Sequence, residues 1–423
     1  MNLKNIFGYG FVVKSFSYKF VVKIINNEIV AKMKQTWISP RIIIGPTATG
    51  DYYYHRPNIA EAIWSEVLKG SHVLIAAPRR VGKSSVMIYM ADHCPENTKG
   101  IFKVIQGVTS DEQFYAFIYD LMRDCLGKFQ KMAEWLKEDA DLRKIGPSGI
   151  ELGEGRKIDY LKKIKKLLPK IASKKVKIVL FLDELPEVLH YLYTYNKKEQ
   201  ASALLDNLRG WRLNWRENFN FVLAGSVGIH HIVQKHEGRT ADLNDLREVV
   251  FEAFTIEEAY DYVGWATKNA SVQYDDTLKK YLLSKINFYL PYFINLMLDE
   301  IDKSAVRTNN RNITTQDIDT AFEQNVKHSD HFKEWKARLY DYFARDDADF
   351  LNEVLTYLSH KETINKRKLY DLAIKHNKQN SYVDLVDGLE TDGYIIEQAD
   401  NYVFVSPFLQ AYWKRQNEYY DAR

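Results

Sequence analysis

Two patterns of apolar residues divide the chain near residue 254. From about Ile42 to Phe251, short apolar runs alternate with longer stretches whose apolar residues recur at helical spacing. The expected strands are the runs at 73–76, 101–105, 176–184 and 220–226. Strands that alternate with helices are typical of a parallel α/β sheet, because each parallel pair needs a crossover connection.

Helix boundaries in this first part are marked by specific residues. Residues 57–69 have apolar positions at helical spacing, with Pro57 at the start and Gly70 beyond the end, which predicts a helix. Ser110 and Gln113 have the spacing of a capping box and predict the start of another helix.

The segment between the second and third expected strands is rich in polar residues. Residues 131–155 are polar and contain glycines, so we expect a surface insertion. The run 157–177 is dense in lysine, yet Ile158, Leu161 and Ile164 begin a helical apolar stripe that continues at Leu168. We therefore interpret its charges as the solvated face of a helix rather than a nucleic-acid site.

Beyond residue 254 the pattern becomes helical. Thr255 with Glu258 and Thr314 with Asp317 have capping-box spacing, and the stretch 281–301 predicts one long apolar helix. These features predict a small helical region.

The C-terminal part has a third organisation. Residues 349–413 contain three short helical patterns, followed by β-type runs at 394–397 and 402–405 that are separated by a polar turn. Three helices and a β-hairpin predict a winged helix.

The strongest chemical motif follows the first expected strand. Residues 77–84 read APRRVGKS and lie between an apolar strand and an apolar helix, which is the context of a phosphate-binding loop. Lys83 is expected to reach the β- and γ-phosphates and the Ser84 hydroxyl to coordinate Mg²⁺. Ala77 replaces the usual first glycine, so it must adopt a conformation that tolerates a Cβ. The alternative, a chance string in a turn, does not explain the flanking strand and helix.

Two later strands end in residues suited to the same chemistry. The run 176–184 ends in Asp183 and Glu184, which we expect to hold the metal and to polarise the attacking water. The run 220–226 ends in Ser226, where ligands of open α/β sheets lie. Ser226 is either a sensor of the γ-phosphate or a turn residue that ends the strand.

Composition adds few constraints. With 423 residues and 46% hydrophobic content, the chain can form two or three domains with sizeable cores. A formal net charge of +3 indicates neither a nucleic-acid binder nor an acidic partner. Cys94 and Cys125 are the two cysteines, and their apolar contexts favour structural thiols in a reducing cytoplasm.

No membrane association is expected. No apolar stretch approaches the roughly 20 residues of a transmembrane helix. Residues 1–30 are broken by Lys and Asn and lack the features of a signal peptide. They are either a poorly ordered extension or sequence upstream of a true start at Met33.

Several segments are similar to the prokaryotic archaeal-type AAA ATPases of the STAND group, the signal-transduction ATPases with numerous domains. The resemblance covers roughly residues 50–415. It rests on YYHR at 53–56, APRRVGKSS at 77–85, VLFLDELPEVL at 179–189, AGS at 224–226, LNDL at 243–246, TIEEA at 255–259 and FVSPFL at 404–409.

The resemblance implies ATP and Mg²⁺ as ligands. It assigns phosphate and Mg²⁺ binding to Lys83 and Ser84, metal binding to Asp183, and the role of catalytic carboxylate to Glu184. Pro291 falls where relatives carry a Gly-x-Pro near the adenine, although this chain lacks that glycine. The expected nucleotide-binding residues are Ala77, Pro78, Arg79, Arg80, Val81, Gly82, Lys83, Ser84, Ser85, Asp183, Ser226 and Pro291.

The remaining candidate residues are interpreted as having no catalytic or metal-binding role. Arg239 and Arg247 follow the last expected strand, but neither can be assigned as an arginine finger, and each is interpreted as a surface residue. His230, His231 and His236 have no cysteine nearby, so ordinary helix and loop histidines are favoured over a metal site.

These features predict an ATP-binding, slowly hydrolysing molecular switch, in which the nucleotide sets the angle between sheet domain, lid and winged helix. The alternatives are an ATP-gated DNA-binding regulator and an oligomerising defence or signalling scaffold, with a protein partner or self-association left open. The expected divisions are an N-terminal extension at 1–40, the ATPase domain at 41–253, the helical lid at 254–330, a linker at 331–348 and the winged helix at 349–423.

The third helix of the expected winged helix argues against DNA as the main partner. In a helix-turn-helix this helix enters the major groove. Here, residues 381–391 include Asp384, Asp387 and Glu390 but no Lys or Arg. Carboxylates would oppose the counterion release that supplies most non-specific affinity for DNA. We expect this region to pack on the ATPase domain or on a protein partner.

Overall fold

The computed structural model describes residues 37–77, 79–127, 158–173, 176–225, 228–238, 240–328 and 330–420. The expected insertion at 131–155 and the segment 1–36 lie outside these ranges. Within the described ranges, no helix is both long and apolar enough to cross a membrane.

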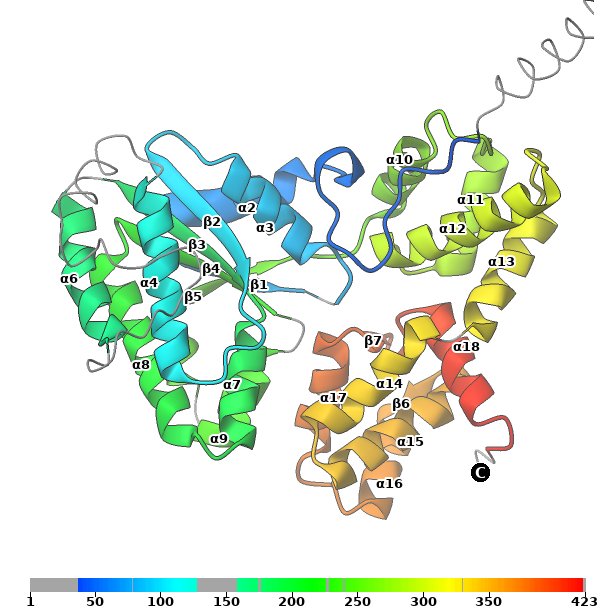
Figure 1. Cartoon of the computed structure of the whole chain (residues 1–423). Coiled ribbons are helices and arrows are strands. Elements are labelled where there is room, and N and C mark those ends of the chain that lie inside the picture. Colours follow the sequence, from blue (N-terminus) through cyan, green and yellow to red (C-terminus); the bar gives the residue numbers. More distant parts are fainter. Residues whose placement is uncertain are drawn as a thin grey trace, which may run out of the picture.

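A five-stranded parallel sheet forms the first part of the molecule (Figure 1). Its spatial order is β2-β3-β4-β1-β5, and its neighbouring strands pair in parallel. The strands are β1 His72–Ala76, β2 Thr98–Val104, β3 Lys177–Asp183, β4 Phe219–Ala224 and β5 Leu246–Val250. The expected parallel sheet is confirmed. The sequence pattern missed β5, because this edge strand is partly exposed and carries Arg247 and Glu248.

The two faces of the sheet bury separate cores because successive side chains of a strand point in opposite directions. In β3, Val179 and Phe181 face the core that includes α2 and α3. Ile178, Leu180 and Leu182 face the core that includes α4, α6, α7, α8 and α9 (Figure 1). Burial on both faces explains the continuous apolar run of this strand.

The helices around the sheet are α2 Pro57–Leu68, α3 Lys83–Asp92, α4 Asp111–Gly127, α6 Tyr160–Ser173, α7 Leu185–Thr194, α8 Lys198–Trp215 and α9 Ile229–Glu237. The helix predicted at 57–69 is confirmed, with Pro57 in its first turn. The capping box before α4 is only half formed. Ser110 accepts the N–H of Gln113, but the Gln113 side chain accepts from Thr109 instead of Ser110.

Helix α6 confirms most of the predicted lysine-rich amphipathic helix. Ile164 and Leu168 are buried, together with Leu167 and Ile171. The inclusion of Ile158 in the stripe was wrong, because this residue precedes the helix and its side chain is 43% exposed.

The helical lid consists of α10 Ile256–Ala266, α11 Asp276–Ile286, α12 Pro291–Thr308 and α13 Thr315–Lys327. The capping boxes at Thr255 and Thr314 are both present. The single helix expected at 281–301 was wrong. It is split because Asn287 adopts a left-handed φ of 59° at the end of α11 and Pro291 opens α12.

The C-terminal region contains α14 Asp330–Tyr342, α15 Arg345–Lys361, β6 Ile364–Asn365, α16 Lys366–Lys375, α17 Tyr382–Thr391, β7 Ile395–Gln398, β8 Asn401–Phe404 and α18 Pro407–Gln416. The antiparallel sheet has the order β6-β8-β7, and with α15, α16 and α17 it makes the predicted winged helix. The stretch 331–348, which we expected to be a linker, is mostly helical. Phe332, Trp335 and Leu339 recur at helical spacing and are buried, and this burial holds α14 in place.

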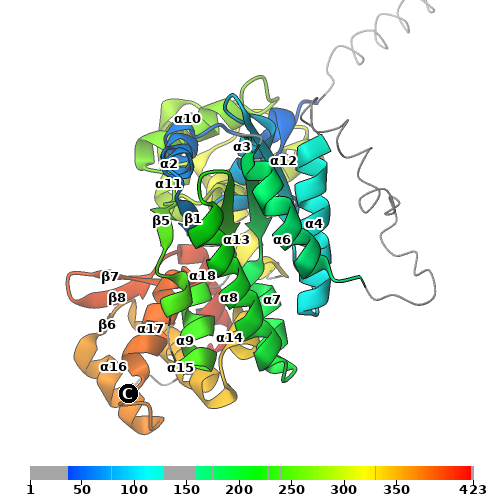
Figure 2. The ribbon, with the colours of Figure 1, turned by 90° about the vertical axis from the view of Figure 1, so that its left-hand side faces the viewer.

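The C-terminal region contacts both other parts of the molecule (Figures 1 and 2). The Phe408 ring of α18 packs on Phe293 and Phe322 of the lid, with ring centroids 5.5 and 4.6 Å away. Helix α17 approaches the sheet part, where Thr391 lies so near Gly228 that a Cβ at Gly228 would be 3.3 Å from its methyl carbon. Figure 2 shows α17 beside α9.

Candidate functional site

The loop between β1 and α3 has the backbone conformation that its glycine requires. Gly82 has φ of 106°, a left-handed value that favours glycine, and it caps the N-terminus of α3. Ala77 has no positive φ, so a Cβ is tolerated there. Arg80 adopts a left-handed φ of 68°, which is a strained conformation for a non-glycine residue. Pro78 lies outside the described residues.

Lys83 and Ser84 lie at the start of α3 and face the carboxyl end of β3. The Lys83 ammonium is buried and donates a hydrogen bond to the Ala77 carbonyl oxygen at 3.0 Å. Its burial lowers the pKa of Lys83 to about 8. The Ser84 hydroxyl donates to the carboxylate of Asp183, 99 residues later in the chain. The structure thus brings together the two motifs that the sequence pattern predicted to meet.

Asp183 and Glu184 end β3 and begin the turn into α7. Asp183 is 3% exposed, and burial raises the pKa of its carboxyl group, while the hydrogen bond from Ser84 acts in the opposite direction. Glu184 has a left-handed φ of 68°, and its N–H bonds to the Ala224 carbonyl oxygen at 2.9 Å. A non-glycine residue in this region at the end of a sheet strand is typical of functional sites.

A cavity of about 430 Å³ opens in front of these residues. Its walls come from the segment before α2, the loop of β1, the end of β3 and the first turn of α12. The lining residues include Tyr53, Arg56, Arg79, Arg80, Val81, Gly82, Lys83, Ser84, Ser85, Asp183, Glu184, Pro291 and Tyr292. Pro291 therefore lies at the same cavity as the loop, as its assignment requires.

Four residues of this cavity carry buried polar atoms without a hydrogen-bond partner among the described residues. These atoms are Tyr53 Oη, Arg56 Nε, Arg79 Nη1 and Arg80 Nε. Unpaired buried donors are costly, and three of the four belong to cations. The donor set fits an anionic ligand with many acceptor oxygens, such as the phosphates of a nucleotide.

Arg56 contacts the segment that connects the sheet to the lid, between β5 and α10. Its guanidinium lies 4.8 Å from the ring centroids of both Phe251 and Phe254. It also donates to the Glu252 carbonyl oxygen at 2.9 Å and to the Glu258 carboxylate at 3.3 Å. The position of Arg56 at the cavity was not predicted, although it lies in the segment YYHR that supports the family resemblance.

Helix α14 reaches the phosphate-binding loop, which sequence reasoning did not predict. The Glu334 carboxylate forms ion pairs with Arg79 and, at 3.2 Å, with Arg80. Eight residues later, the Tyr342 hydroxyl donates to Glu187 in the first turn of α7. A residue such as Glu334 in a charged helix carries no signal in the sequence that separates it from a solvated side chain.

Three other residues considered in the sequence, Ser226, Arg239 and Arg247, are not among those that the structure places at this cavity. Ser226 and Arg239 lie outside the described residues. Gly225 packs so tightly that a Cβ would lie 2.5 Å from Pro186. Arg247 lies on the edge strand β5, with its side chain exposed.

The histidines of α9 have local partners. His230 lies 3.1 Å from the Glu248 carboxylate, and the His236 ring stacks on Tyr193 at 4.4 Å. The His231 side chain lies outside the described part of the chain. In the part that is described, no group of three or more His, Cys, Asp or Glu residues is arranged to hold a metal ion.

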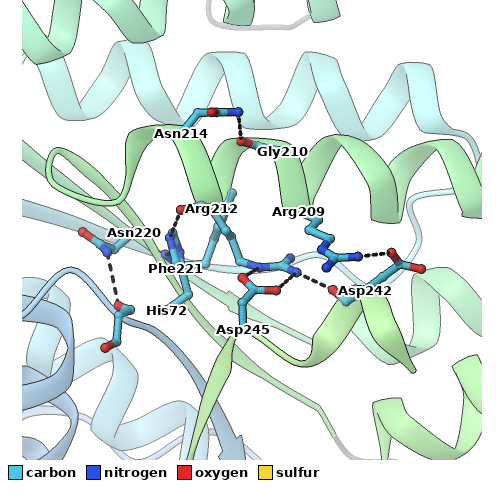
Figure 3. A network of polar contacts seen from close by, with 10 residues as sticks. His72, Arg209, Gly210, Arg212, Asn214, Asn220, Phe221, Asp242 and Asp245 are labelled. Carbon is cyan, nitrogen blue, oxygen red and sulfur yellow. Dashed lines mark hydrogen bonds and ion pairs between the residues drawn. The ribbon is translucent and has the colours of Figure 1, made fainter. Parts of the chain in front are cut away.

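A second buried polar cluster lies at the opposite, amino end of the strands (Figure 3). Arg212 of α8 is 2% exposed and binds both oxygens of Asp245, with N···O distances of 2.6 and 2.9 Å. It also donates to the Asp242 carbonyl oxygen. Asn220 of β4 donates to the Ser71 carbonyl oxygen and accepts from Lys177.

His72 belongs to this cluster and has one clear tautomer. Nδ1 accepts the N–H of Phe221 at 3.0 Å, so Nε2 carries the proton and donates to the Arg212 carbonyl oxygen at 3.1 Å. A second ring proton would face the Phe221 N–H. Burial, with the nearby Arg212 charge, lowers the pKa of His72 to about 3.

Comparison with known proteins adds evidence on the fold alone. No family model matches the chain, and no curated protein matches it. Among solved structures, the Walker-type ATPase PABY2304 of Pyrococcus abyssi is similar with a TM-score of 0.58 at 15% identity, over 88% of this chain and 99% of that chain. The ORC2 protein of Aeropyrum pernix, solved as ADPNP-ADP complexes, is similar with a TM-score of 0.50 at 12% identity, over 85% and 92% of the two chains. This chain therefore has the fold of the P-loop AAA-type ATPases, followed by a helical region and a small antiparallel sheet.

Proposed function

We propose that this protein binds ATP with Mg²⁺ and hydrolyses it. The observation that carries the proposal is the hydrogen bond between Ser84 and Asp183, because it joins the phosphate-binding loop to the strand that ends in Glu184. Lys83 would pair with the phosphates, and Ser84 and Asp183 would hold Mg²⁺. Glu184 would orient and polarise the attacking water. Bound Mg²⁺ would neutralise phosphate charge.

The unpaired atoms of the cavity support the choice of ligand. Arg79 and Arg80 supply cations beside Lys83, and Tyr53 adds a donor near the N-terminal wall. Charge-assisted hydrogen bonds to phosphate oxygens would satisfy these donors. The similar Pyrococcus protein is described as an ATPase, and the similar Aeropyrum structure holds ADPNP and ADP.

We further propose that hydrolysis serves as a molecular switch of the STAND type in the cytoplasm. The cavity is bounded by the sheet part and by α12 of the lid, so its occupant contacts both. Arg79 and Arg80 also pair with Glu334 of the C-terminal region. A ligand that engages these arginines would change the contacts between all three parts. We propose domains at 41–253, 254–330 and 349–423, with the third contact made by α14, which occupies most of the stretch 331–348 that we expected to be a linker.

A protein partner or self-association is a better-supported output than DNA reading. Asp384 and Asp387 of α17 line a second cavity of about 800 Å³, together with His230 and Lys235 of α9. Asp384 and Asp387 are exposed at this cavity beside the sheet part, and their negative charge is unsuited to contact with DNA phosphates. This arrangement disfavours the DNA-binding regulator and leaves the signalling scaffold as the alternative.

Binding of Mg²⁺-ATP by titration calorimetry tests the site. We expect Lys83→Ala to raise the Kd for ATP by roughly a hundredfold or more, since it removes a buried charge-assisted interaction with phosphate. Arg79→Ala or Arg80→Ala should raise the Kd for ATP much less. Lys69→Ala is the matched control, because this lysine is exposed and pairs with Glu66, away from the cavity. Unchanged ATP binding by Lys83→Ala would refute the assignment.

A further inference from the structure

One side of α14 runs along the phosphate-binding site. Glu334, Arg338 and Tyr342 are spaced four residues apart, so their side chains follow one another along the same side of the helix. Glu334 is held by Arg79 and Arg80 of the loop, and Tyr342 is held by Glu187 of α7. Arg338 must therefore lie opposite the space between the loop and the start of α7.

That space is where Lys83 and Glu184 meet. Lys83 opens α3 at the end of the loop that follows β1, and Glu184 lies just before α7. Among the charges close enough to affect the Lys83 ammonium are those of Asp183, Glu184, Arg338 and Asp392. The last two belong to the C-terminal region, so this region contributes one cation and one anion to the surroundings of the loop lysine.

Arg338 is a positioned residue rather than a mobile surface charge. It is 8% exposed, and its guanidinium lies 5.0 Å from the centroid of the Tyr342 ring. It also donates a hydrogen bond to the Tyr394 hydroxyl, which in turn donates to the Trp335 carbonyl oxygen at 2.7 Å. A guanidinium held in this way presents a fixed fork of donors, which suits phosphate oxygens.

Asp392 is the anion that accompanies Arg338. It caps the C-terminus of α17 and is 9% exposed. Together with Ala77 of the loop, it lines the second cavity, of about 800 Å³. The cations that act on its carboxylate are Arg338, Lys83 and Arg79. A terminal phosphate bound to the loop would attract the same three cations.

We propose that Arg338 is the residue through which the C-terminal region detects the terminal phosphate of the bound nucleotide, and that Asp392 competes with that phosphate for Arg338, Lys83 and Arg79. This inference rests on the proposed binding of ATP. It makes Arg338 an arginine finger that acts on the nucleotide of its own chain. This arginine lies on α14, far in the sequence from both the loop after β1 and the carboxylates that end β3. The terminal phosphate of ATP takes the place of Asp392 as the nearest anion to these cations, whereas ADP, which lacks this phosphate, leaves Asp392 as the anion that faces them.

The test compares ADP with a non-hydrolysable ATP analogue, each with Mg²⁺, on the full chain. We expect Arg338→Gln to raise the Kd for the ATP analogue roughly tenfold to hundredfold and to change the Kd for ADP less than about threefold. ATP turnover should fall by roughly a hundredfold or more. Asp392→Asn should have the opposite effect and lower the Kd for the ATP analogue about tenfold, because it removes the competing charge.

Control variants separate phosphate detection from a structural role. Lys333→Gln removes a cation from the same helix, but Lys333 is exposed and pairs with Asp330, so both Kd values should be unchanged. Arg338→Lys keeps the charge without the fork and should give an intermediate Kd for the ATP analogue. If Arg338→Gln fails to fold, Arg338→Lys and Asp392→Asn decide the question.

The inference is overturned if Arg338→Gln, or Arg338→Lys in its place, shifts both Kd values equally or leaves both unchanged. It is also overturned if Asp392→Asn does not tighten binding of the ATP analogue. The proposed function fails separately, when Lys83→Ala binds both nucleotides as well as the wild type does. If Lys83→Ala abolishes binding, but substitution of Arg338 leaves the ratio of the Kd for the ATP analogue to the Kd for ADP unchanged, only the role of Arg338 is refuted.

Discussion

The two ends of the parallel sheet bury similar polar residues but leave them in different states. At the amino end, Arg212, Asp245 and His72 satisfy one another and the adjacent backbone (Figure 3). At the carboxyl end, Arg79 and Arg80 each retain a buried nitrogen without a partner in the described part of the chain. The first cluster is complete within the chain, whereas the second needs acceptors from a ligand.

This difference separates a structural polar cluster from a binding site. A buried ion pair that is fully hydrogen-bonded within the chain fixes neighbouring elements, here α8 and the segment before β5. Buried donors without partners are costly, and several of them gathered on the wall of one cavity favour a ligand that supplies the missing acceptors. The presence of buried charge is therefore a poor guide to function, and the completeness of its hydrogen bonding is a better one.

The largest expected effect is the loss of stability when the polar cluster at the amino end is broken. Arg212→Ala removes a fully buried side chain and leaves the partly buried Asp245 without its bidentate partner, and we expect it to lower the free energy of unfolding by about 3 kcal/mol. Lys83→Ala at the other end should change it by less than about 1 kcal/mol, because its charge is already disfavoured by burial. Urea denaturation without nucleotide measures both. Arg216→Ala is the control, since this arginine is exposed. Equal losses for Arg212→Ala and Lys83→Ala would contradict the comparison.

The next largest effect distinguishes the roles of Asp183 and Glu184 at the carboxyl end of the sheet. Glu184→Gln should bind ATP normally but hydrolyse it roughly a hundredfold more slowly, because a general base is lost. Asp183→Asn should also weaken binding that depends on Mg²⁺, because a metal ligand becomes neutral. Steady-state turnover and ATP titrations with and without Mg²⁺ measure these outcomes. Glu217→Gln, at an exposed position, should match the wild type. Normal turnover by Glu184→Gln would place hydrolysis elsewhere.

A smaller effect uses the pH dependence of ATP binding. The pKa of Lys83 is lowered to about 8, so the ammonium loses its proton as pH rises through that value. If the charged form binds phosphate, the Kd for ATP should rise about tenfold between pH 7 and pH 9. Titration calorimetry at several pH values measures this slope. Lys83→Arg should remove the slope, because arginine stays charged. A Kd that stays constant to pH 9 would show that Lys83 does not titrate in this range.

The smallest expected effect concerns DNA. Because α17 has no Lys or Arg and exposes Asp384 and Asp387, the full chain should bind duplex DNA no more tightly than a non-specific binder, with Kd above roughly 1 μM at physiological salt. Selection from a random-sequence duplex pool should enrich no motif. A single enriched motif bound with submicromolar affinity would instead support the DNA-binding regulator.

The sequence predicted the local structure of the carboxyl end well. Lys83 and Ser84 follow a strand and open a helix, and a run of apolar residues ends at Asp183. Such features depend on short segments, where hydrophobic period and backbone preferences suffice. The meeting of Ser84 with Asp183 could be anticipated, because carboxyl ends of parallel strands share one edge of the sheet. Strand β5 could not, since an exposed edge strand leaves a weak pattern.

Other features were decided by tertiary structure alone. In the sequence, Glu334 and Arg338 resemble any charged residues of a solvated helix, and Asp392 resembles a turn residue. Their positions beside the loop depend on how the C-terminal region packs on the lid and the sheet. Periodicity specifies which side of a helix is buried, but only the packing of distant elements decides what that side meets, because contacts between distant segments depend on the whole chain. For the same reason, the pairing of Arg212 with Asp245 could be seen only in the folded molecule.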